Sequence, residues 1–363
     1  MSRLVRLIDT GIEDARRNIA FDQALIELHK SGVVPDTIRF LRFRPSALIG
    51  RHQALSRELD LAFCRAHDIG IARRITGGGA LYLDKRQLGW EIVCDRRSLG
   101  VTALADVTRV ICEAAADGLS RLGVPVRFRP RNDLEVDGRK LGGTGGFFDG
   151  ETIFFQGTVL LELDPAIMFG ALRVPAEKRA RHGAAAAATR VVALKDLLRG
   201  ALPELDVIKA ALLDGLRDLL GIVVEPSAVS AAEWACAAAL YREEIGTDAF
   251  VSEIDDPAAS DDCRGATRAT RGGTVTAFVR LACGVPLRLA AVIITGDFFV
   301  TPPRVVLDLE AALRDVRVAD VPAAVTAFFT NTRPDLLSLS PDDIVAVIVA
   351  AAGGDRGDCV DAL

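Results

Sequence analysis

An α+β fold with a largely antiparallel or mixed sheet is predicted by three features of the 363-residue sequence. Amphipathic helical segments and short alternating strands both occur, but they do not follow one another as regular βαβ units. Half of the residues are hydrophobic and 26% are charged, which is enough for a substantial core. A change in composition near Glu225 divides the chain into expected domains of residues 1–225 and 226–363.

The first predicted domain begins with a helix followed by short strands. Residues 17–32 place apolar side chains at helical spacing and end on a glycine, which predicts an amphipathic helix. Residues 37–43 alternate apolar and basic side chains, as a half-buried strand does. The same criteria predict a strand and turn over 46–53, a short helix over 59–70, strands on both sides of a glycine turn within 71–84, and a strand over 87–95.

A long helix and a group of glycine-rich strands come next. The segment 101–123 has helical periodicity, with Thr102 as its expected N-cap and Gly123 at its end. Residues 126–164 predict several short strands joined by glycine-rich turns.

A helical pattern then fills residues 164–225, and its alanine run 184–188 is expected to form a loop or a loose helix. The second predicted domain again mixes helices and strands. Its expected elements are a helix over 230–246, a polar, glycine-containing linker over 255–273, two or three strands over 274–300, a helix over 302–316 and a buried helix over 344–354.

Composition excludes several classes of function. The net charge of -5, from 44 basic and 49 acidic residues, argues against a general nucleic-acid binder. The longest apolar run is about half of the roughly 20 residues that span a bilayer, and the charged N-terminus does not resemble a signal peptide. Seven scattered cysteines without CxxC spacing predict reduced thiols in a cytoplasmic protein, and four histidines make a structural zinc site unexpected.

Three consecutive glycines, Gly77 to Gly79, form the first candidate site. Glycines let a backbone approach a ligand closely and expose N–H groups to an anion. Arg73 and Arg74 directly before them add positive charge for a phosphate or carboxylate. The competing interpretation is a plain β-hairpin with a glycine turn, and neither a P-loop nor a dinucleotide-binding motif is present.

A single lysine within a glycine-rich segment is the second candidate. Only six of the 44 basic residues are lysines, and Lys140 lies within residues 131–145. Chance explains one such lysine as readily as function does. An ammonium is nevertheless a compact point charge that fits against a phosphate or a polarised carbonyl, whereas arginine is a broad fork. Asn132 and Asp133 supply amide and carboxylate groups beside it.

These segments, taken together, resemble the lipoate-protein ligase family. The resemblance rests on RRITGGGALYLD at 73–84, NDLEVDGRKLGGTG at 132–145, FQGTVLLELD at 155–164, LRFRPSALIGRHQ at 41–53 and AATRVVALKDLL at 187–198. It covers about residues 3–222. It implies a catalytic domain of the biotin/lipoyl ligase type, with the C-terminal part resembling a smaller α+β accessory domain.

The resemblance implies an ATP-dependent reaction in two steps. Lipoate or octanoate attacks the α-phosphate of ATP to form an acyl-adenylate, and a lysine of an acceptor protein then takes the acyl group. Lys140 falls on the family's active-site lysine, and Asp133 is expected to bind Mg²⁺. Ile75, Leu81 and Leu83 are expected to line the acyl pocket. The implied ATP and acyl-adenylate site comprises Arg73, Arg74, Thr76, Gly77, Gly78, Gly79, Asn132, Asp133, Lys140, Gln156, Gly157 and Thr158.

Departures from the family pattern leave the acyl chain and the acceptor open. Leu83 and Gln156 stand where the family usually has histidine, and Gly143 lacks the hydroxyl of the serine common there. The expected acceptors are acyltransferase subunits of 2-oxo acid dehydrogenases, the glycine-cleavage carrier, or a lipoate-binding protein of sulfur metabolism. We expect neither nucleic acid nor a membrane as a partner.

Sequence features also bear on three alternatives to the ligase. An octanoyl or lipoyl transferase independent of ATP needs a cysteine to hold the acyl group as a thioester, yet none lies between Cys112 and Cys236. A non-catalytic binder of lipoyl domains would be expected to lose Lys140. Biotin ligases share the expected fold, but their GRGRxGRxW loop is missing. The ligase is therefore the expected activity.

Overall fold

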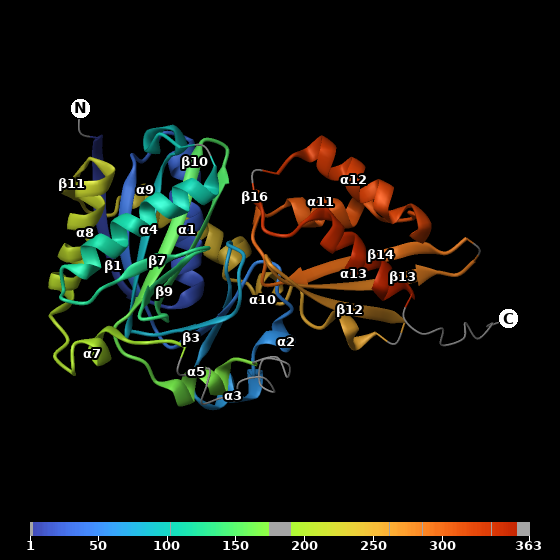
Figure 1. Ribbon diagram of the computed structural model, residues 1–363, viewed down its shortest axis with the longest axis horizontal. Helices are drawn as coiled ribbons and strands as arrows, with labels where there is room; N and C mark the ends of the chain where they lie inside the picture. The colour runs from blue at the N-terminus through green and yellow to red at the C-terminus, as the bar shows by residue number, and fades with distance from the viewer. Residues whose placement is uncertain are drawn as a thin grey trace. The chain divides into compact units, whose positions relative to one another are not determined.

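The computed structural model describes residues 3–101, 103–173, 190–260, 262–284, 286–334 and 336–353. Two compact units can be followed along the chain in Figure 1. Unit 1 comprises residues 1–48, 59–73 and 81–251, and unit 2 comprises residues 49–58, 74–80 and 252–363. Helices and strands are mixed in both units, and the α+β prediction is confirmed.

The core of unit 1 is a mixed, mostly antiparallel sheet of eight strands. Strand β1 pairs in parallel with β11 and β2, whereas each neighbouring pair from β2 across the sheet to β7 is antiparallel. Across the sheet, the order is β11 (Ile222–Pro226), β1 (Arg3–Glu13), β2 (Thr37–Phe43), β6 (Gln87–Asp95), β10 (Thr152–Leu160), β9 (Arg139–Asp149), β8 (Asp133–Val136) and β7 (Arg127–Arg129).

Helices cover both faces of this sheet. Directly paired residues point to the same face, and one such row consists of Arg39, Glu91, Gln156 and Gly145. Helix α1 (Ala15–Lys30) covers this face, because its Asp22 accepts a hydrogen bond from Arg39 at 2.7 Å. Helix α4 (Leu104–Ser120) covers the opposite face, where Cys112 Sγ lies 3.3 Å from Thr144 Oγ1.

The other helices of unit 1 are mostly short. They are α3 (Leu61–Ala66), α5 (Pro165–Ala171), α7 (Leu194–Leu197), α8 (Leu205–Leu220), α9 (Ala231–Leu240) and α10 (Asp248–Val251), with a 3-10 helix (Arg96–Leu99) and a π-helical turn (Tyr241–Ile245).

Unit 1 extends past the expected domain boundary at Glu225, because α9 packs on the first helix. The ring of Trp234 lies 5.1 Å from that of Phe21. Glu233, at the third position of α9, accepts hydrogen bonds from both arms of the Arg6 guanidinium on β1. These contacts place residues 226–251 with the large sheet instead of with the C-terminal strands.

The glycine-rich segment 74–80 is not the turn of a β-hairpin. Strands β4 (Gly70–Arg73) and β5 (Leu81–Leu83) lie on either side of β3 (Ser46–Ile49) and do not pair with each other. The segment between them belongs to unit 2. The hairpin interpretation is therefore wrong.

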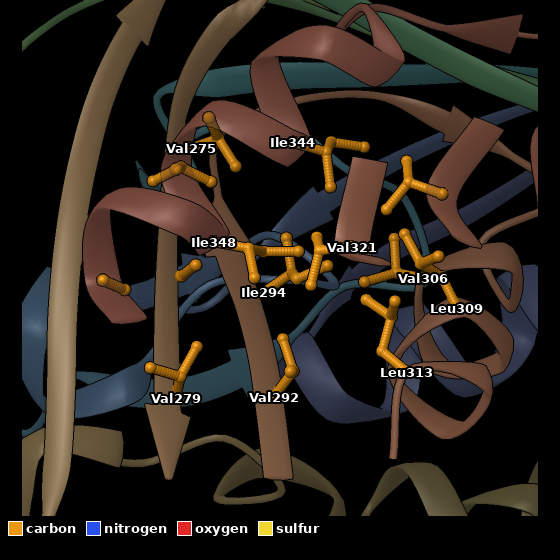
Figure 2. Close-up of a cluster of buried hydrophobic side chains, with 14 of the residues drawn as sticks. Val275, Val279, Val292, Ile294, Val306, Leu309, Leu313, Val321, Ile344 and Ile348 are labelled. Carbon is orange, nitrogen blue, oxygen red and sulfur yellow. The ribbon is translucent and has the colours of Figure 1, made fainter. Parts of the chain in front are cut away.

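Unit 2 packs helices against a small antiparallel sheet. Figure 2 shows the apolar core between them, which includes Val275, Ile294, Val306, Val321 and Ile348. The sheet has the order β12 (Cys263–Thr270), β13 (Gly273–Ala282) and β14 (Arg288–Gly296), and β15 (Val300–Thr301) pairs with β16 (Leu336–Leu337). The helices are α2 (Leu55–Glu58), α11 (Val305–Ala312), α12 (Val321–Thr332) and α13 (Pro341–Gly353), with 3-10 helices at Pro257–Ala259 and Val318–Asp320.

Part of the expected polar linker 255–273 is in fact a strand. Strand β12 pairs with β13 from Cys263 opposite Arg280 to Thr270 opposite Gly273. Edge position and partial exposure explain its polar composition, because a strand of this kind contributes few apolar side chains to the core. The linker prediction is wrong for this part of the segment.

A buried ionic cluster lies between α1 and the large sheet. The fully buried Arg39 guanidinium donates to Asp22 at 2.7 Å, to Glu91 at 3.0 Å and to Asn18 at 2.7 Å. Burial raises the pKa of both Asp22 and Glu91, against the lowering influence of Arg39. Because one guanidinium faces two carboxyls, the cluster favours holding a proton, which limits the buried charge.

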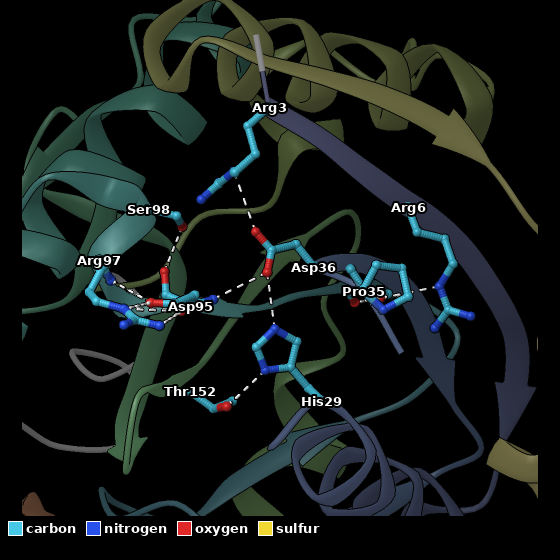
Figure 3. Close-up of polar contacts among 10 residues, drawn as sticks. Arg3, Arg6, His29, Pro35, Asp36, Asp95, Arg97, Ser98 and Thr152 are labelled. Atoms are coloured by element: carbon cyan, nitrogen blue, oxygen red, sulfur yellow. Dashed lines mark hydrogen bonds and ion pairs between the residues drawn. The ribbon is translucent and has the colours of Figure 1, made fainter. Parts of the chain in front are cut away.

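A second polar network, drawn in Figure 3, ties the end of α1 to the starts of two strands. His29 Nδ1 lies 2.8 Å from Thr152 Oγ1, and His29 Nε2 lies 3.0 Å from Asp36 Oδ1. Asp36 also pairs with Arg3 at 3.5 Å and accepts the Asp95 N–H at 3.2 Å. These contacts are local to the edge where the strands begin, and we assign them a structural role.

Two expected features fall outside the described residues, namely the Thr102 N-cap and the alanine run 184–188. Within the described part of the chain, no helix is both long and apolar enough to span a bilayer.

Candidate functional site

The side chain of Lys140 lies over a glycine near one end of the large sheet. In the register of β7, β8 and β9, Arg129 faces Asp133, and Asp133 faces Gly143. Lys140 Nζ lies 2.8 Å from Asp133 Oδ1. A Cβ added at Gly143 would lie 2.8 Å from this amine. The ammonium thus occupies the space that a side chain at position 143 would fill.

The backbone of Lys140 is fixed by a short parallel bridge. Its N–H donates to the Arg190 carbonyl at 2.8 Å, and its carbonyl accepts the Val192 N–H at 2.9 Å. The side chain remains 34% exposed, so a substrate can still reach the amine. A fixed backbone with an accessible ammonium suits a group that stabilises charge on a bound ligand.

The Asp133 carboxylate is shared by two cations. Lys140 contacts Oδ1, and Arg129 donates to Oδ2. Arg129 Nε also lies 3.3 Å from Glu135 Oε2. Burial raises the pKa of Asp133, but Lys140 and Arg129 outweigh burial and bring the pKa below its usual value. Asp133 is therefore ionised at neutral pH and holds the Lys140 ammonium in place.

Asp133 does not fit the expected role of a magnesium ligand in this arrangement. Each of its oxygens already carries a cation. The side-chain amide of its neighbour Asn132 donates to the Thr144 carbonyl at 2.6 Å. Among the described residues, no group of three or more His, Cys, Asp or Glu side chains is arranged to hold a metal ion. We derive no reaction step through Mg²⁺.

Asn132 and Thr158 support the strand that carries Gly143. The Asn132 carbonyl accepts the Thr144 N–H at 2.8 Å and its hydroxyl at 3.0 Å. Thr158 Oγ1 lies 3.3 Å from the Gly143 nitrogen and 3.4 Å from its carbonyl oxygen. Both predicted ligand-binding residues thus adjoin residues that contact the Lys140 amine. Asn132 directly precedes Asp133 in the chain, and Thr158 contacts Gly143.

Gln156 and Gly157 lie in the middle of β10 and point to opposite faces of the sheet. Gln156 is half-buried and faces Glu91 on β6 and Gly145 on β9. Gly157 faces Trp90, and a Cβ at Gly157 would overlap the indole ring. Gly157 is therefore needed for packing, whereas Gln156 shares the face of Gly145.

Arg73 and two predicted acyl-pocket residues belong to the small sheet of unit 1. The buried Arg73 guanidinium donates to the backbone carbonyls of Phe250 at 3.1 Å and of Val251 at 2.9 Å. Leu81 and Leu83 on β5 pair with Leu48 and Ser46, respectively, on β3. Only Leu83 of these two is fully buried.

Arg74 and the three glycines lie in unit 2. Arg74 donates to the carbonyls of Gly77 and Gly79, each at 3.0 Å. Burial lowers the pKa of Arg74 to about 10, so the guanidinium stays charged at neutral pH. Gly78 has a φ of +91°, a conformation that favours glycine, and its N–H donates to the Phe298 carbonyl at 3.2 Å.

Thr76 and Ile75 complete this segment. The Thr76 carbonyl accepts the Arg51 N–H at 2.9 Å, and its hydroxyl lies 3.4 Å from Arg74 Nε. Ile75 is buried, and its role in an acyl pocket stays a prediction. The expected site residues therefore form three groups: one on β8, β9 and β10 of unit 1, one in the small sheet of unit 1, and one in the glycine segment of unit 2.

The three buried cysteines are poorly suited to hold an acyl thioester. Cys64, Cys94 and Cys112 are buried. Burial raises the pKa of Cys94 and of Cys112 to about 12, so the nucleophilic thiolate is scarce at neutral pH. Cys112 contacts the hydroxyl of Thr144, which points to the face of β9 opposite Gly143 and Gly145.

Arg129 is the residue near Lys140 that the motif comparison missed. It precedes the matched segment, and its relation to Asp133 depends on the turn between β7 and β8. The sequence does contain a signal that could have identified Arg129. This arginine lies four residues before Asp133, on the other side of a short hairpin, where opposite charges on paired strands stabilise each other.

Comparisons with known proteins agree on one family. Residues 14–217 match the family described as the lipoyl protein ligase A/B catalytic domain. An octanoyltransferase LipM of Geobacillus kaustophilus is 28% identical over 267 residues, which cover 67% of this chain and 96% of the relative. A lipoate-protein ligase A subunit 1 of Thermoplasma acidophilum is 26% identical over 257 residues, which cover 68% and 94%.

Solved structures have the same fold. A bipartite lipoate protein ligase of Thermoplasma acidophilum, described with its E2 lipoyl domain, aligns with a TM-score of 0.60 and 24% identity over 70% of this chain and 96% of its own. P. falciparum LipL1 in complex with lipoate aligns with a TM-score of 0.72 and 13% identity over 95% and 99%. At these identities the likeness supports the fold.

Proposed function

The chain belongs to the lipoyl protein ligase A/B catalytic-domain family, and on that premise we propose that it transfers an octanoyl or lipoyl group to a lysine of a lipoyl-acceptor domain. The observation that carries this proposal is the Lys140 ammonium held by Asp133 over Gly143. The structure of the Thermoplasma ligase, described together with a lipoyl domain, supports the choice of acceptor.

The chemistry of the transfer requires a fixed positive charge near the acyl carbonyl. The acceptor amine attacks the carbonyl carbon, a C–N bond forms, and negative charge develops on the carbonyl oxygen. The leaving group then departs with its bonding electron pair, and the amine loses a proton. An ammonium held in advance stabilises the developing charge without reorganising. Lys140 meets this requirement, because Asp133 holds its amine and its side chain is partly exposed.

Different observations support two possible donors of the acyl group. Relatives named octanoyltransferase favour a donor that needs no ATP, and they support this alternative better than the ATP-dependent ligase. The buried, high-pKa thiols of Cys94 and Cys112 do not favour an enzyme-bound thioester. A ligase subunit is also among the relatives, at 26% identity.

Because the thiols of Cys94 and Cys112 are buried and have raised pKa values, we take an acyl-adenylate made from ATP as the first candidate donor. The Arg74 guanidinium and the glycine segment would then bind the phosphates. The second candidate is direct transfer from an acyl thioester of a carrier protein, with the acceptor lysine attacking that thioester without passing through a cysteine of this chain. Octanoate and lipoate remain equal candidates for the acyl group.

An intact-mass measurement of a recombinant lipoyl domain tests both donors. The domain is incubated with the full chain and, in separate reactions, with octanoate plus MgATP, preformed octanoyl-adenylate, or an octanoyl-carrier thioester without ATP. An octanoyl mass gain with the first two donors supports the ligase. A gain with only the thioester supports the transferase, and no gain with any donor, after lipoyl donors are also tried, rejects the proposed function.

Two controls define the transfer site. A lipoyl domain whose target lysine is changed to arginine should gain no mass with any donor. A preparation in which Cys64, Cys94 and Cys112 are all changed to alanine should remain active if no thioester is formed on them, provided that circular dichroism confirms folding.

A further inference from the structure

Arg129 and its two carboxylate partners form a charge arrangement that the proposed reaction does not itself account for. Resting on the proposed function, we propose that Arg129 is a positioning residue that shares the Asp133 carboxylate with Lys140 and so keeps the Lys140 ammonium available to substrate oxygens.

The strand register places these groups in one row. Arg129 on β7 is directly opposite Asp133 on β8, and Asp133 is directly opposite Gly143 on β9. Because Gly143 has no side chain, the Lys140 amine reaches back over it and completes the row. The order across three strands is therefore cation, carboxylate, cation. Asp133 uses a different oxygen for each cation.

Glu135 adds a second, weaker contact to the Arg129 side chain. Arg129 Nη2 donates a hydrogen bond to Asp133, whereas its Nε forms an ion pair with Glu135 Oε2 at 3.3 Å without hydrogen-bond geometry. A guanidinium with one hydrogen-bonded and one ion-paired carboxylate has less rotational freedom than one in a single surface ion pair. The carboxylate side chains are only 18% and 22% exposed, so solvent screens them less than it screens the 43% exposed arginine.

The charge balance explains why a second cation is needed. Lys140 and Arg129 together match the charges of Asp133 and Glu135. Without Arg129, one ammonium would face two carboxylates, and the net charge of the group would fall from zero to -1. An anionic substrate would be repelled, and Asp133 would pair with Lys140 alone. By sharing the Asp133 carboxylate, Arg129 thus keeps Asp133 from neutralising the positive charge of the Lys140 ammonium.

The test compares Arg129→Gln with Arg127→Gln in the full-length chain. Arg127 is a matched control, because it is an exposed arginine on the same strand that lies opposite Glu135 in the register, yet the structure gives no ion pair for it within the described residues. Arg129→Gln should lower kcat/KM for acyl transfer by about fivefold, the scale of a partly exposed ion pair. Arg127→Gln should stay within about twofold of the parent chain.

The pH profile separates positioning from a purely structural role. Arg129 helps to lower the pKa of Asp133, so its loss should raise that pKa and move the acid limb of kcat to higher pH. Arg129→Lys should return the acid limb towards that of the parent, because it restores the charge. Melting temperatures of all variants are measured to account for loss of folded protein.

The outcomes distinguish this inference from the proposed function. If the parent chain transfers acyl groups but Arg129→Gln matches Arg127→Gln in both rate and pH profile, Arg129 has no positioning role. A lower rate with an unshifted acid limb also overturns the inference, since a structural effect then suffices. If the parent chain is inactive with every donor, the proposed function itself fails.

Discussion

At the scale of single residues, the candidate site depends on one amine and one missing side chain. The Lys140 ammonium lies where a Cβ of residue 143 would point, and Asp133 holds it there. Lysine suits this place because its charge is compact, whereas the planar arginine fork needs more room. The scarcity of lysine elsewhere in the chain agrees with a specific role for this one.

We expect Lys140→Ala to lower acyl transfer by at least about 100-fold, the scale of losing one donor that stabilises a developing oxyanion. Lys140→Arg should also be strongly impaired, because Gly143 provides space for an ammonium but not for a guanidinium. Single-turnover transfer from preformed octanoyl-adenylate measures the effect on the second step directly. An arginine variant close to the parent rate would contradict the proposed importance of the point charge.

Substitutions of the neighbouring residues Gly142 and Gly143 should have different effects. At Gly143, an added methyl group would meet the flexible end of Lys140, so Gly143→Ala should fold but displace the amine and reduce activity about tenfold, less than the roughly 100-fold expected for losing the donor altogether. At Gly142, a methyl group would overlap the Thr158 backbone carbonyl, which cannot move easily. Gly142→Ala should therefore lower the melting temperature by several degrees, as expected for about 1–3 kcal/mol of overpacking.

Melting curves and transfer rates of both variants decide this prediction. Equal loss of stability in the two would show that the space above Gly143 has a packing role instead of serving Lys140.

At the scale of elements, partners distant in sequence decide how several segments behave. Strand β12 is too polar to be predicted, yet its pairing with β13 makes it part of a sheet. Helix α11 carries Glu310, whose Oε1 accepts the Ile294 N–H of β14 at 2.6 Å. Burial, helped by the nearby Glu253, raises the pKa of Glu310 to about 7 against the lowering influence of the Ile294 hydrogen bond and of nearby arginines.

This elevated pKa gives unit 2 a defined dependence on pH. An unfolded glutamate titrates near its ordinary pKa of 4.5, so the folded state binds the proton more tightly. The stabilising effect of this protonation is fully present below about pH 4.5 and is lost as the pH rises through about 7. Glu310→Gln keeps a side-chain oxygen for the Ile294 N–H but cannot ionise.

We therefore expect Glu310→Gln to raise the melting temperature relative to the parent at pH 8, with a smaller difference at pH 5. Differential scanning calorimetry at both pH values measures the change. Asp308→Asn, on the same helix, controls for the removal of a negative charge from an exposed ion pair with Arg304. A gain from Glu310→Gln that is the same at pH 5 and pH 8 would contradict the assigned titration.

At the scale of the whole molecule, the two units are not two halves of the sequence. Unit 2 takes residues 49–58 and 74–80 from within the first part of the chain, and unit 1 keeps α9 and α10 from beyond the expected boundary. The boundary for a shortened chain is therefore Val251. Cutting at Glu225 would remove the partner of Arg6 and the ring packed on Phe21.

We expect a chain ending at Val251 to be more soluble and to melt at a higher temperature than a chain ending at Glu225. Both lack the strands and helices with which the glycine segment associates in unit 2, for example the Phe298 carbonyl that accepts the Gly78 N–H. The chain ending at Val251 should therefore lose ATP-dependent activity but still transfer the acyl group from preformed octanoyl-adenylate. Circular dichroism accompanies both assays, and full ATP-dependent activity without residues 252–363 would show that unit 2 has another role.

The sequence by itself determined the local features of this protein. Helical periodicity predicted α1, because the pattern comes from which face of the segment is buried. Alternation also predicted strand β2, but β2 is buried on both faces instead of half-buried, because Arg39 joins the ionic cluster with Asp22 and Glu91. The glycines around Lys140 and the neighbouring Asp133 were also visible, since these residues are close together along one hairpin. They sufficed to indicate the family and a candidate amine.

Only the tertiary structure decided which segments share a unit and which charges share a carboxylate. The placement of β3 between β4 and β5 rules out the competing hairpin interpretation, and long-range packing on Phe21 and Arg6 places α9 in unit 1. The row formed by Arg129, Asp133 and the Lys140 amine depends on the register of three strands. Pairing and burial of this kind depend on residues far apart in the chain, and no local pattern encodes them.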